Sequence, residues 1–258
     1  MRIPPSRLRP GLHVVRRDDR HLQIGLDHPW RVIVPDLPDV QRLLADLAAG
    51  RSPAPTTPES HRALRDLVAA DLLVDPATTT ERTHALVSVE ATGPAAADVL
   101  RLLRAADCRV AESETDRATV AVLVAEGEPD RASVDAQVRA GRAHLVVSRT
   151  PGGFTIGPFV VPGRTACLRC VDAHRGERDP RRAVVVEQLA GRSAGPSDPA
   201  LLAVATAWAV RDLLSWLDGR VPSTWSASVT IGADLAPARQ EWTRHPHCGC
   251  SWADDLVG

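Results

Sequence analysis

The chain has 258 residues and a mass of 27.7 kDa, and 44% of its residues are hydrophobic, enough for one large or two modest domains. The formal net charge of -1 and a pI of 6.8 give no overall attraction to nucleic acid or to anionic membranes. All 31 basic residues are arginine, so the chain has no lysine for Schiff-base chemistry or for binding a nucleotide phosphate.

The first part of the chain predicts a small antiparallel sheet. Three apolar runs, 8–15, 21–26 and 30–34, are separated by polar turns, which is typical of short strands joined by hairpins. The start of the chain, "MRIPPSRLRP", lacks the apolar core of a signal peptide.

Two amphipathic helices are predicted after these strands. The first spans 36–50, with Asp36 as its cap, Gly50 at its end, and Leu37 among the residues of its apolar face. The second begins at Thr57, followed by Pro58 in the first turn, and its apolar face includes Val68.

Three strands with two or three helices have the size of a winged-helix-like module, which we assign to residues 1–76. The polar stretch 75–83 is predicted to be a linker.

From residue 84 the pattern alternates between strands and helices. Runs predicted as strands lie at 84–90, 118–126 and 143–149, and helices are predicted at 93–107 and 129–141. This alternation is typical of a parallel sheet with crossover helices, so we expect a Rossmann-like α/β domain over 84–258. Its later part is predicted to contain a polar helical region up to about residue 195, an apolar helix over 198–219, and strands at 223–234 and 238–245.

The turn after the first strand of this domain is where a nucleotide phosphate would bind. The dinucleotide fingerprint needs three glycines, whereas "VEATGPAAAD" contains Gly93 alone, and Pro94 removes a backbone donor. Glu112 and Glu114 are spaced to contact a ribose, but without the glycines we interpret them as surface charge. The sequence therefore predicts a nucleotide-type architecture without ATP binding.

Four of the five cysteines form two close pairs, Cys167 with Cys170 and Cys248 with Cys250. Four thiolates match the tetrahedral preference of zinc, and a reducing compartment favours a metal over disulfides. A four-cysteine site has no open coordination position, so we expect the zinc to be structural. A redox or unpaired quartet and a catalytic metal remain alternatives.

Several other residues near these motifs have simpler interpretations. Cys108 lies at a helix end with no base in its sequence neighbourhood, so we expect a buried structural cysteine. Three histidines are close to the cysteine pairs in sequence, and because four thiols already complete a site we interpret them as surface groups or as neighbours of the ligands: His174, His245 and His247.

No run of about 18 apolar residues occurs in the sequence. Together with the start of the chain, this predicts a cytoplasmic protein without a membrane partner.

The string "GPFVVPGRTACLRC", a later apolar helix containing tryptophan, and the terminal "HPHCGC" together resemble the ThiF-like proteins of azole-forming peptide natural-product clusters. The resemblance covers nearly the whole chain. It implies that residues 1–76 are a peptide-recognition element and that 84–258 are an adenylating-enzyme-like domain. It also implies a structural zinc on the same four cysteines.

The function implied by the resemblance is non-catalytic. Members bind the leader of a ribosomally made precursor peptide and present it to a YcaO-type cyclodehydratase or another modifying enzyme. The reduced glycine motif and the absence of lysine lead us to expect no ATP. The sequence contains no YcaO segment, so the modifying enzyme is expected to be a separate chain, and a homodimer stays open.

In recognition elements of this type the leader lies between the third strand and a following helix. A disordered leader adds as a strand to an exposed sheet edge, where main-chain hydrogen bonds supply affinity. The resemblance maps this site onto the strand residues Arg31, Val32, Ile33 and Val34 and onto a helical face that includes Arg62, Arg65 and Asp66.

Two other classes of function stay open. One is a divergent ATP-dependent ThiF-type adenylyltransferase, which pyrophosphate exchange would reveal. The other is a winged-helix DNA-binding regulator, and the neutral overall charge and the weakly basic helix at 36–50 oppose it. We therefore expect no nucleic-acid partner.

Overall fold

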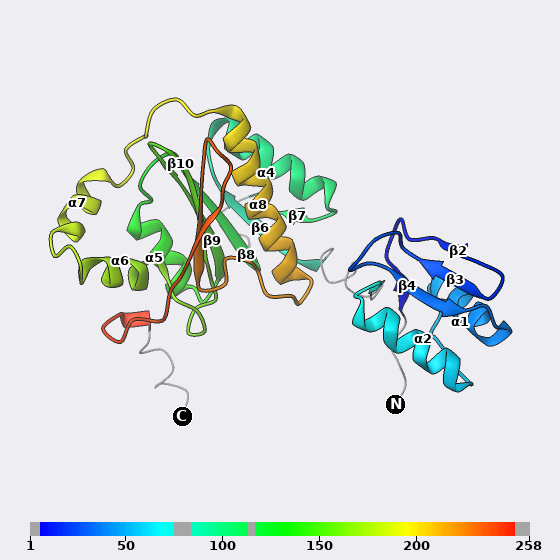
Figure 1. Cartoon of the computed structure of the whole chain (residues 1–258). Coiled ribbons are helices and arrows are strands. Elements are labelled where there is room, and N and C mark those ends of the chain that lie inside the picture. Colours follow the sequence, from blue (N-terminus) through cyan, green and yellow to red (C-terminus); the bar gives the residue numbers. More distant parts are fainter. Residues whose placement is uncertain (1–5, 75–83, 113–116, 251–258) are drawn as a thin grey trace. The chain divides into compact units, whose positions relative to one another are not determined.

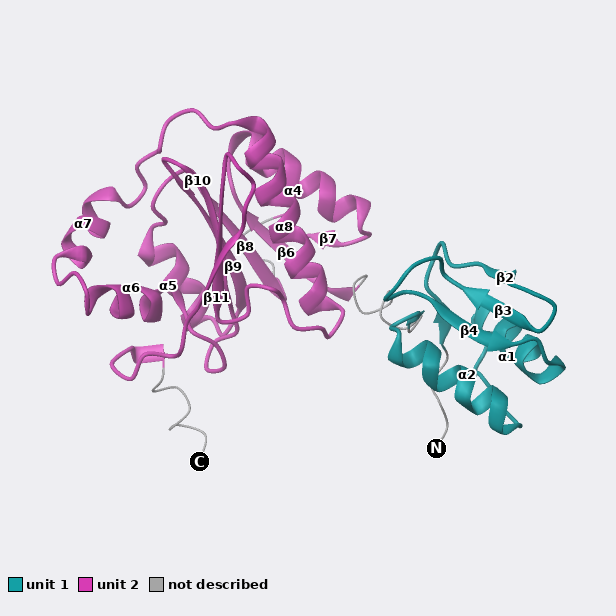
Figure 2. Ribbon diagram, in the orientation of Figure 1, with its two compact units in different colours: residues 1–80 teal, residues 81–258 magenta. Residues whose placement is uncertain are grey.

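The chain forms two compact units, residues 1–80 and 81–258, in a computed structural model (Figures 1 and 2). The structure describes residues 6–74, 84–112 and 117–250. The predicted linker at 75–83 lies outside the described residues.

Unit 1 combines a three-stranded antiparallel sheet with two helices. The sheet has the order β2-β3-β4, with β2 Val14–Arg16, β3 His21–Ile24 and β4 Val32–Pro35. The helices are α1 Pro38–Ala48 and α2 Pro58–Ala69. The predicted strands at 21–26 and 30–34 and both helices are confirmed. The first predicted strand, 8–15, is wrong in its extent, because residues 9–13 are not in a strand and only its last two residues belong to β2. A separate two-residue ladder, β1 Arg7–Leu8 with β5 Leu73–Val74, is too short to leave a periodic signal.

The core of unit 1 lies between one face of this sheet and the two helices. Alternation along β3 and β4 buries one residue in two, and α1 and α2 each contribute residues spaced three or four apart. The buried side chains that form this core are Leu8, Leu22, Ile24, Val32, Val34, Val40, Leu43, Leu44, Leu47, Ala63, Leu64, Leu67 and Leu72.

The start of α1 differs from the prediction. Its N-cap is Leu37, without a side-chain cap, and Pro38 occupies the first turn. Asp36 instead accepts a hydrogen bond from the side-chain amide of Gln41 and forms an ion pair with Arg16 at 3.2 Å. Leu37 therefore lies outside the helix and is 42% exposed.

The start of α2 follows the prediction more closely. Thr57 is the N-cap, and its hydroxyl accepts a hydrogen bond from the Ser60 N–H at 3.3 Å in a capping box. The carboxylate of Asp39 accepts from the hydroxyls of Thr56 and Thr57, which ties α1 to the start of α2. Val68, predicted on the apolar face, is 59% exposed.

Unit 2 is built on a seven-stranded mixed sheet of Rossmann-like α/β type. From one edge to the other it contains β12 Ala238–Glu241, β11 Ala227–Gly232, β10 Gly153–Val160, β9 Ala143–Thr150, β8 Val120–Ala125, β6 Leu86–Glu90 and β7 Arg109–Val110. The strands β7, β6, β8 and β9 are parallel, and β10 to β12 are antiparallel additions. The predicted alternation is thus confirmed over 84–150.

Helices cover both faces of this sheet (Figure 1). Their bounds are α4 Gly93–Ala105, α5 Arg131–Arg139, α6 Leu168–Gly176, α7 Arg182–Leu189 and α8 Pro199–Leu217. Val120 and Val122 of β8 pack with α4 and α8 on one face. Ala121 and Leu123 pack with α5 and α6 on the other, so β8 is buried on both sides.

Strand β10 was not predicted, because its segment is rich in glycine and proline. The pairing with β9 shifts register between Ile156 and Phe159, and this bulge contains Gly157. Gly157 has φ +96°, and a Cβ there would lie 2.4 Å from the Ala227 carbonyl oxygen. The residues that mark a turn in sequence thus permit close packing of two strands.

Among the described residues, α8 is the one helix long and apolar enough to cross a membrane by length and composition alone. In the structure, its Ala205, Ala209 and Leu213 are fully buried in the core of unit 2. Here α8 therefore serves as a core helix.

A buried ion-pair network joins α5 to the segment before it and to α6. Arg131 is 3% exposed, and its guanidinium contacts the Asp172 carboxylate at 2.6 and 2.9 Å. The same group donates to the Pro129 carbonyl at 2.6 Å and to the Glu128 carboxylate. Burial by itself lowers the pKa of Arg131, but the bonds to Asp172 raise it above its ordinary value.

His144 of β9 makes the stability of unit 2 depend on pH. Its side chain is fully buried, and Nδ1 donates to the Arg142 carbonyl at 2.9 Å. Within the described structure, Nε2 has no hydrogen-bond partner. Burial lowers the pKa of His144 from 6.5 to about 4, so the unfolded chain binds the proton first as the pH falls.

We expect this histidine to destabilise unit 2 by about 2 kcal/mol at pH 5 relative to pH 7. Above the unfolded pKa of 6.5, the ring is neutral in both states and does not lower the free energy of unfolding. As the pH falls from 6.5 toward 4, only the unfolded chain takes up the proton, and the free energy of unfolding decreases. Urea unfolding of the wild type and of His144→Leu at both pH values measures it. The exposed His84→Gln serves as a control, and an unchanged pH dependence in His144→Leu would contradict the assignment.

Candidate functional site

The four paired cysteines come together against the α5–α6 face of the sheet. Cys167 is the N-cap of α6 and Cys170 lies in its first turn, while Cys248 and Cys250 belong to the segment after β12. The Sγ–Sγ distances are 3.7 Å for Cys167–Cys170, 3.6 Å for Cys167–Cys248 and 3.4 Å for Cys170–Cys250. The sulfur atoms of all four lie within 4.8 Å of one another.

This geometry fits a zinc ion. Tetrahedral zinc with bonds of about 2.3 Å to sulfur places its sulfur ligands about 3.8 Å apart, close to the observed separations. The thiols are free, and their sulfurs are much farther apart than the roughly 2.05 Å of a disulfide. Three of the four are buried, where several thiolates repel one another unless a cation is bound.

Hydrogen bonds favour deprotonation of one thiol before the others. The thiolate of Cys170 accepts from the Cys167 thiol and from the His245 backbone N–H, which lowers the pKa of Cys170 to about 4. The same thiol–thiolate bond and burial raise the pKa of Cys167. Burial raises the pKa of Cys250 to about 12. A divalent cation would therefore bind with release of protons from the neighbouring thiols.

The three histidines near the cysteines do not share one environment. His174 and His245 lie with Glu177 in a second cluster whose nitrogen and oxygen atoms are within 4.8 Å of one another. His247 is exposed. Cys108 is buried in the α4 side of the core of unit 2, away from the other thiols. Sequence spacing did not predict the partnership with Glu177.

A second candidate site is the open edge of β4, because among the residues that the structure describes β4 pairs with β3 alone. The Asp36 N–H donates to the Arg20 carbonyl at 2.7 Å, so alternation makes Leu22–Val34 and Ile24–Val32 the hydrogen-bonded pairs. Ile33 and Arg31, which alternate with them, therefore direct their backbone N–H and C=O groups away from β3.

The residues predicted to bind a peptide thus divide into two groups. Val32 and Val34 are 7% and 1% exposed, and they belong to the core of unit 1. Ile33 is 40% exposed, and Arg31 is also exposed. On this strand, Arg31 and Ile33 are the residues that a peptide along the edge would meet.

The predicted helical residues Arg62 and Arg65 are exposed on α2, which packs beside β4. Within the described ranges, neither they nor Arg31 form an ion pair, although other arginines of unit 1 do, such as Arg42 with Asp39. Asp66 is exposed on the same helix. Three guanidinium groups of unit 1 are therefore available to a ligand.

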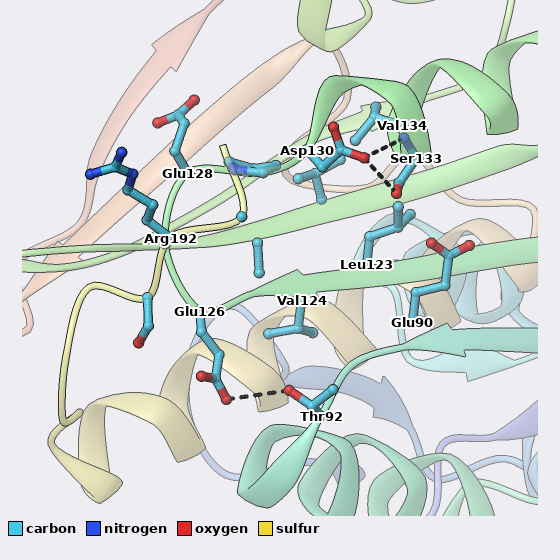
Figure 3. Close-up of a pocket in the computed structure, with 16 residues that line it drawn as sticks. Glu90, Thr92, Leu123, Val124, Glu126, Glu128, Asp130, Ser133, Val134 and Arg192 are labelled. Atoms are coloured by element: carbon cyan, nitrogen blue, oxygen red, sulfur yellow. Dashed lines mark hydrogen bonds between the residues drawn. The ribbon is translucent and has the colours of Figure 1, made fainter. Parts of the chain in front are cut away.

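A pocket of about 340 Å³ lies at the carboxyl ends of β6 and β8 (Figure 3). Helix α4 leads from β6 to β7 on one side, whereas α5 leads from β8 to β9 on the other. The pocket therefore occupies the point where the strand order reverses, which is the usual ligand position in an open α/β sheet.

The pocket is lined by carboxylates (Figure 3). Those of Glu90, Glu126, Glu128 and Asp130 line it together with a single arginine, Arg192. One of the four, Glu128, is paired with the buried Arg131. The acidic run "EGEPD", which begins at the last residue of the predicted strand 118–126, was the available sequence signal.

The start of α4 and the segment 191–194 form hydrogen bonds with the residues that line this pocket. Gly93 has φ +56°, and the Thr92 hydroxyl donates to Glu126 at 3.3 Å. The backbone N–H groups of Ala194 and Gly191 donate to the carbonyls of Glu126 and Glu128, at 2.7 and 3.2 Å. Glu112 is exposed and does not line the pocket, and Glu114 lies outside the described residues.

No protein-family model matches the sequence, and no curated protein sequence matches it. Among solved structures, the heterocyclase TruD has a TM-score of 0.69 at 18% identity over 96% of this chain. A heterocyclase in complex with substrate and cofactor has 0.67 at 15% over 96%. E. coli MccB with ATP has 0.64 at 12% over 96%.

The chain spans 43% and 39% of the two heterocyclase chains and 99% of the MccB chain. At these identities the likenesses establish a shared fold.

Proposed function

We propose that this chain is a non-catalytic recognition scaffold in the biosynthesis of ribosomally made, modified peptides. Unit 1, a winged-helix-like module, binds the leader of a precursor peptide. The chain then presents that peptide to a separate YcaO-type cyclodehydratase or another modifying enzyme in the cytoplasm. The observation that carries the proposal is the open edge of β4, where the backbone groups of Arg31 and Ile33 point away from β3.

An extended peptide can pair with this edge as a fourth strand of the sheet. Each main-chain hydrogen bond contributes about 0.5–1.5 kcal/mol net, so affinity depends on backbone groups and specificity on neighbouring side chains. Pro35 has no N–H and ends the row of donors, so the paired segment is short. Arg62 and Arg65 are exposed on α2, a helix that packs beside β4, and can supply positive charge to an acidic leader.

Unit 2 is proposed as a ThiF-type domain with a structural zinc held by Cys167, Cys170, Cys248 and Cys250. Such a metal ties the end of the described chain to α6 and stabilises the fold. The likeness to two heterocyclases and to MccB supports this assignment.

The alternative of a ThiF-type adenylyltransferase needs ATP at the strand-order reversal. The reduced glycine motif, with Gly93 alone, and the absence of lysine oppose it. The neutral net charge likewise opposes a DNA-binding regulator. The recognition scaffold is therefore the better-supported function.

Replacing Ile33 with proline is expected to weaken leader binding about tenfold, the equivalent of 1.4 kcal/mol. Proline removes the outward N–H of the edge strand but no bond to β3, so unit 1 stays folded. The measurement is a fluorescence-anisotropy titration of the full chain with labelled synthetic leaders from neighbouring precursor genes. Ile33→Thr keeps the N–H and is the matched control.

Alanine at Arg62 and Arg65 tests the helical half of the site in the same titration. Unchanged affinity would remove α2 from the site while leaving the strand edge in place. If no candidate leader binds to the folded wild type, the recognition proposal fails, and pyrophosphate exchange becomes the next measurement.

A further inference from the structure

The cluster of His174, Glu177 and His245 lies next to the cysteine quartet and offers three metal-ligand atoms within 4.8 Å of one another. The cluster is either a second metal site or a support for the first. The hydrogen bonds of its two imidazole rings decide between these roles, because a ligating nitrogen needs a free lone pair while the other nitrogen holds the proton.

The ring of His245 has both nitrogens engaged. The His247 backbone N–H donates to Nδ1 at 3.2 Å, so Nδ1 carries no proton. Nε2 therefore holds the proton and donates it to the Glu177 carboxylate at 3.0 Å. A metal on Nε2 would require a ring without any proton, so the geometry opposes a second metal site.

The backbone of His245 contacts both pairs of cysteines. Its N–H donates to the Cys170 sulfur. Its carbonyl accepts from the Cys248 N–H at 3.0 Å. One residue thus connects the cysteine pair on α6 with the pair in the terminal segment.

The side chain of His245 anchors this backbone to α6. It is 5% exposed, and besides the bond to Glu177 it meets the ring of His174 edge-on, with centroids 4.8 Å apart. His174 in turn bonds the Thr243 carbonyl at 3.0 Å, and it stacks on Trp242. The segment is therefore held by contacts that need no metal.

We propose that His245 is a positioning residue of the metal centre. Its side chain, anchored by Glu177 and His174, holds its backbone N–H on Cys170 and its carbonyl on the Cys248 amide. The terminal thiols are thereby arranged beside α6 before an ion binds. This role rests on the proposed zinc site, and it makes loss of the metal slow.

Zinc release from the full chain to a chromophoric chelator tests the role. We expect His245→Ala to weaken zinc binding by about 10- to 100-fold, the range for groups that orient metal ligands. The matched control is His247→Ala, because it removes an exposed ring and keeps the backbone N–H that bonds His245. We expect the control to release zinc at the wild-type rate.

Two amide variants separate the bonds of the ring. His245→Gln places an N–H near the position of Nε2 and can restore the bond to Glu177. His245→Asn places an oxygen near Nδ1 and can restore only the bond from His247. We expect glutamine to recover more affinity. In cobalt(II) protein, the thiolate charge-transfer band should correspond to four sulfur ligands in every variant, because His245 is not a ligand.

Glu177→Ala removes the hydrogen bond between His245 and Glu177 from the other side. Glu177 is 64% exposed, so we expect its replacement to leave the fold intact. A wild type that binds no zinc would refute the metal site itself. A wild type that binds zinc while His245→Ala and Glu177→Ala release it equally slowly would refute the positioning role alone. Two ions per chain, one of them lost in Glu177→Ala, would show a second metal site instead.

Discussion

Replacing both Cys248 and Cys250 with serine is expected to abolish metal binding. When zinc is present at 1,000 times its Kd, the free energy of unfolding of unit 2 should decrease by about 4 kcal/mol or more. In a domain of this size the loss lowers Tm by roughly 10 °C. The reason is that the two thiolates tie the end of the described chain to Cys167 and Cys170 of α6, and serine hydroxyls do not replace them. Calorimetry together with zinc analysis measures both effects.

Cys108→Ser is the control for this experiment. Cys108 is also buried in unit 2, and its thiol contacts the Ala106 carbonyl at 3.8 Å, but it lies outside the quartet. It should keep one zinc per chain. A chelator should lower the Tm of the wild type and leave the Cys248→Ser/Cys250→Ser protein unchanged. Equal Tm and zinc content in the double variant and the wild type would contradict the structural metal.

The spacing of apolar residues predicted much of the fold. The run of valines in β8 predicted a buried strand, and the spacing of leucines predicted α1 and α2. Strand β10 was not predicted for a local reason. Gly157 permits a bulge in this strand, and a glycine at such a position is typical of a turn in sequence. Leu37 and Val68 fit the helical period, yet each is exposed at the margin of its helix.

A candidate site could be predicted from the sequence where its residues are close together in the chain. The cysteine pairs stand out because each lies within one short turn. The bond between His245 and Glu177 joins positions 68 apart in sequence, so no local spacing encodes it. The alternation of β4 was visible in sequence, and it would have separated the core residues Val32 and Val34 from the outward Ile33.

Asp172→Ala is expected to lower the free energy of unfolding of unit 2 by about 3–5 kcal/mol, because it leaves the guanidinium of Arg131 buried without its bidentate partner. Arg131 is 3% exposed, so water does not replace the carboxylate, and Glu128 alone does not satisfy the group. Urea unfolding at pH 7 measures the loss. Because Asp172 and Cys170 share α6, looser packing against α5 should also speed zinc release.

An exposed ion pair between the same two helices supplies the matched control. Arg169 of α6 contacts Asp135 of α5 at 2.9 Å, with the two side chains 47% and 27% exposed. Asp135→Ala should cost no more than about 1 kcal/mol, because water solvates the arginine left behind. Replacing both partners, Arg131→Met with Asp172→Leu, should recover part of the stability lost in Asp172→Ala, because the fully buried guanidinium is gone while Glu128 and Arg182, each about a quarter exposed, lose a partner. Equal losses in Asp172→Ala and Asp135→Ala would contradict the account, because burial is what distinguishes the two pairs.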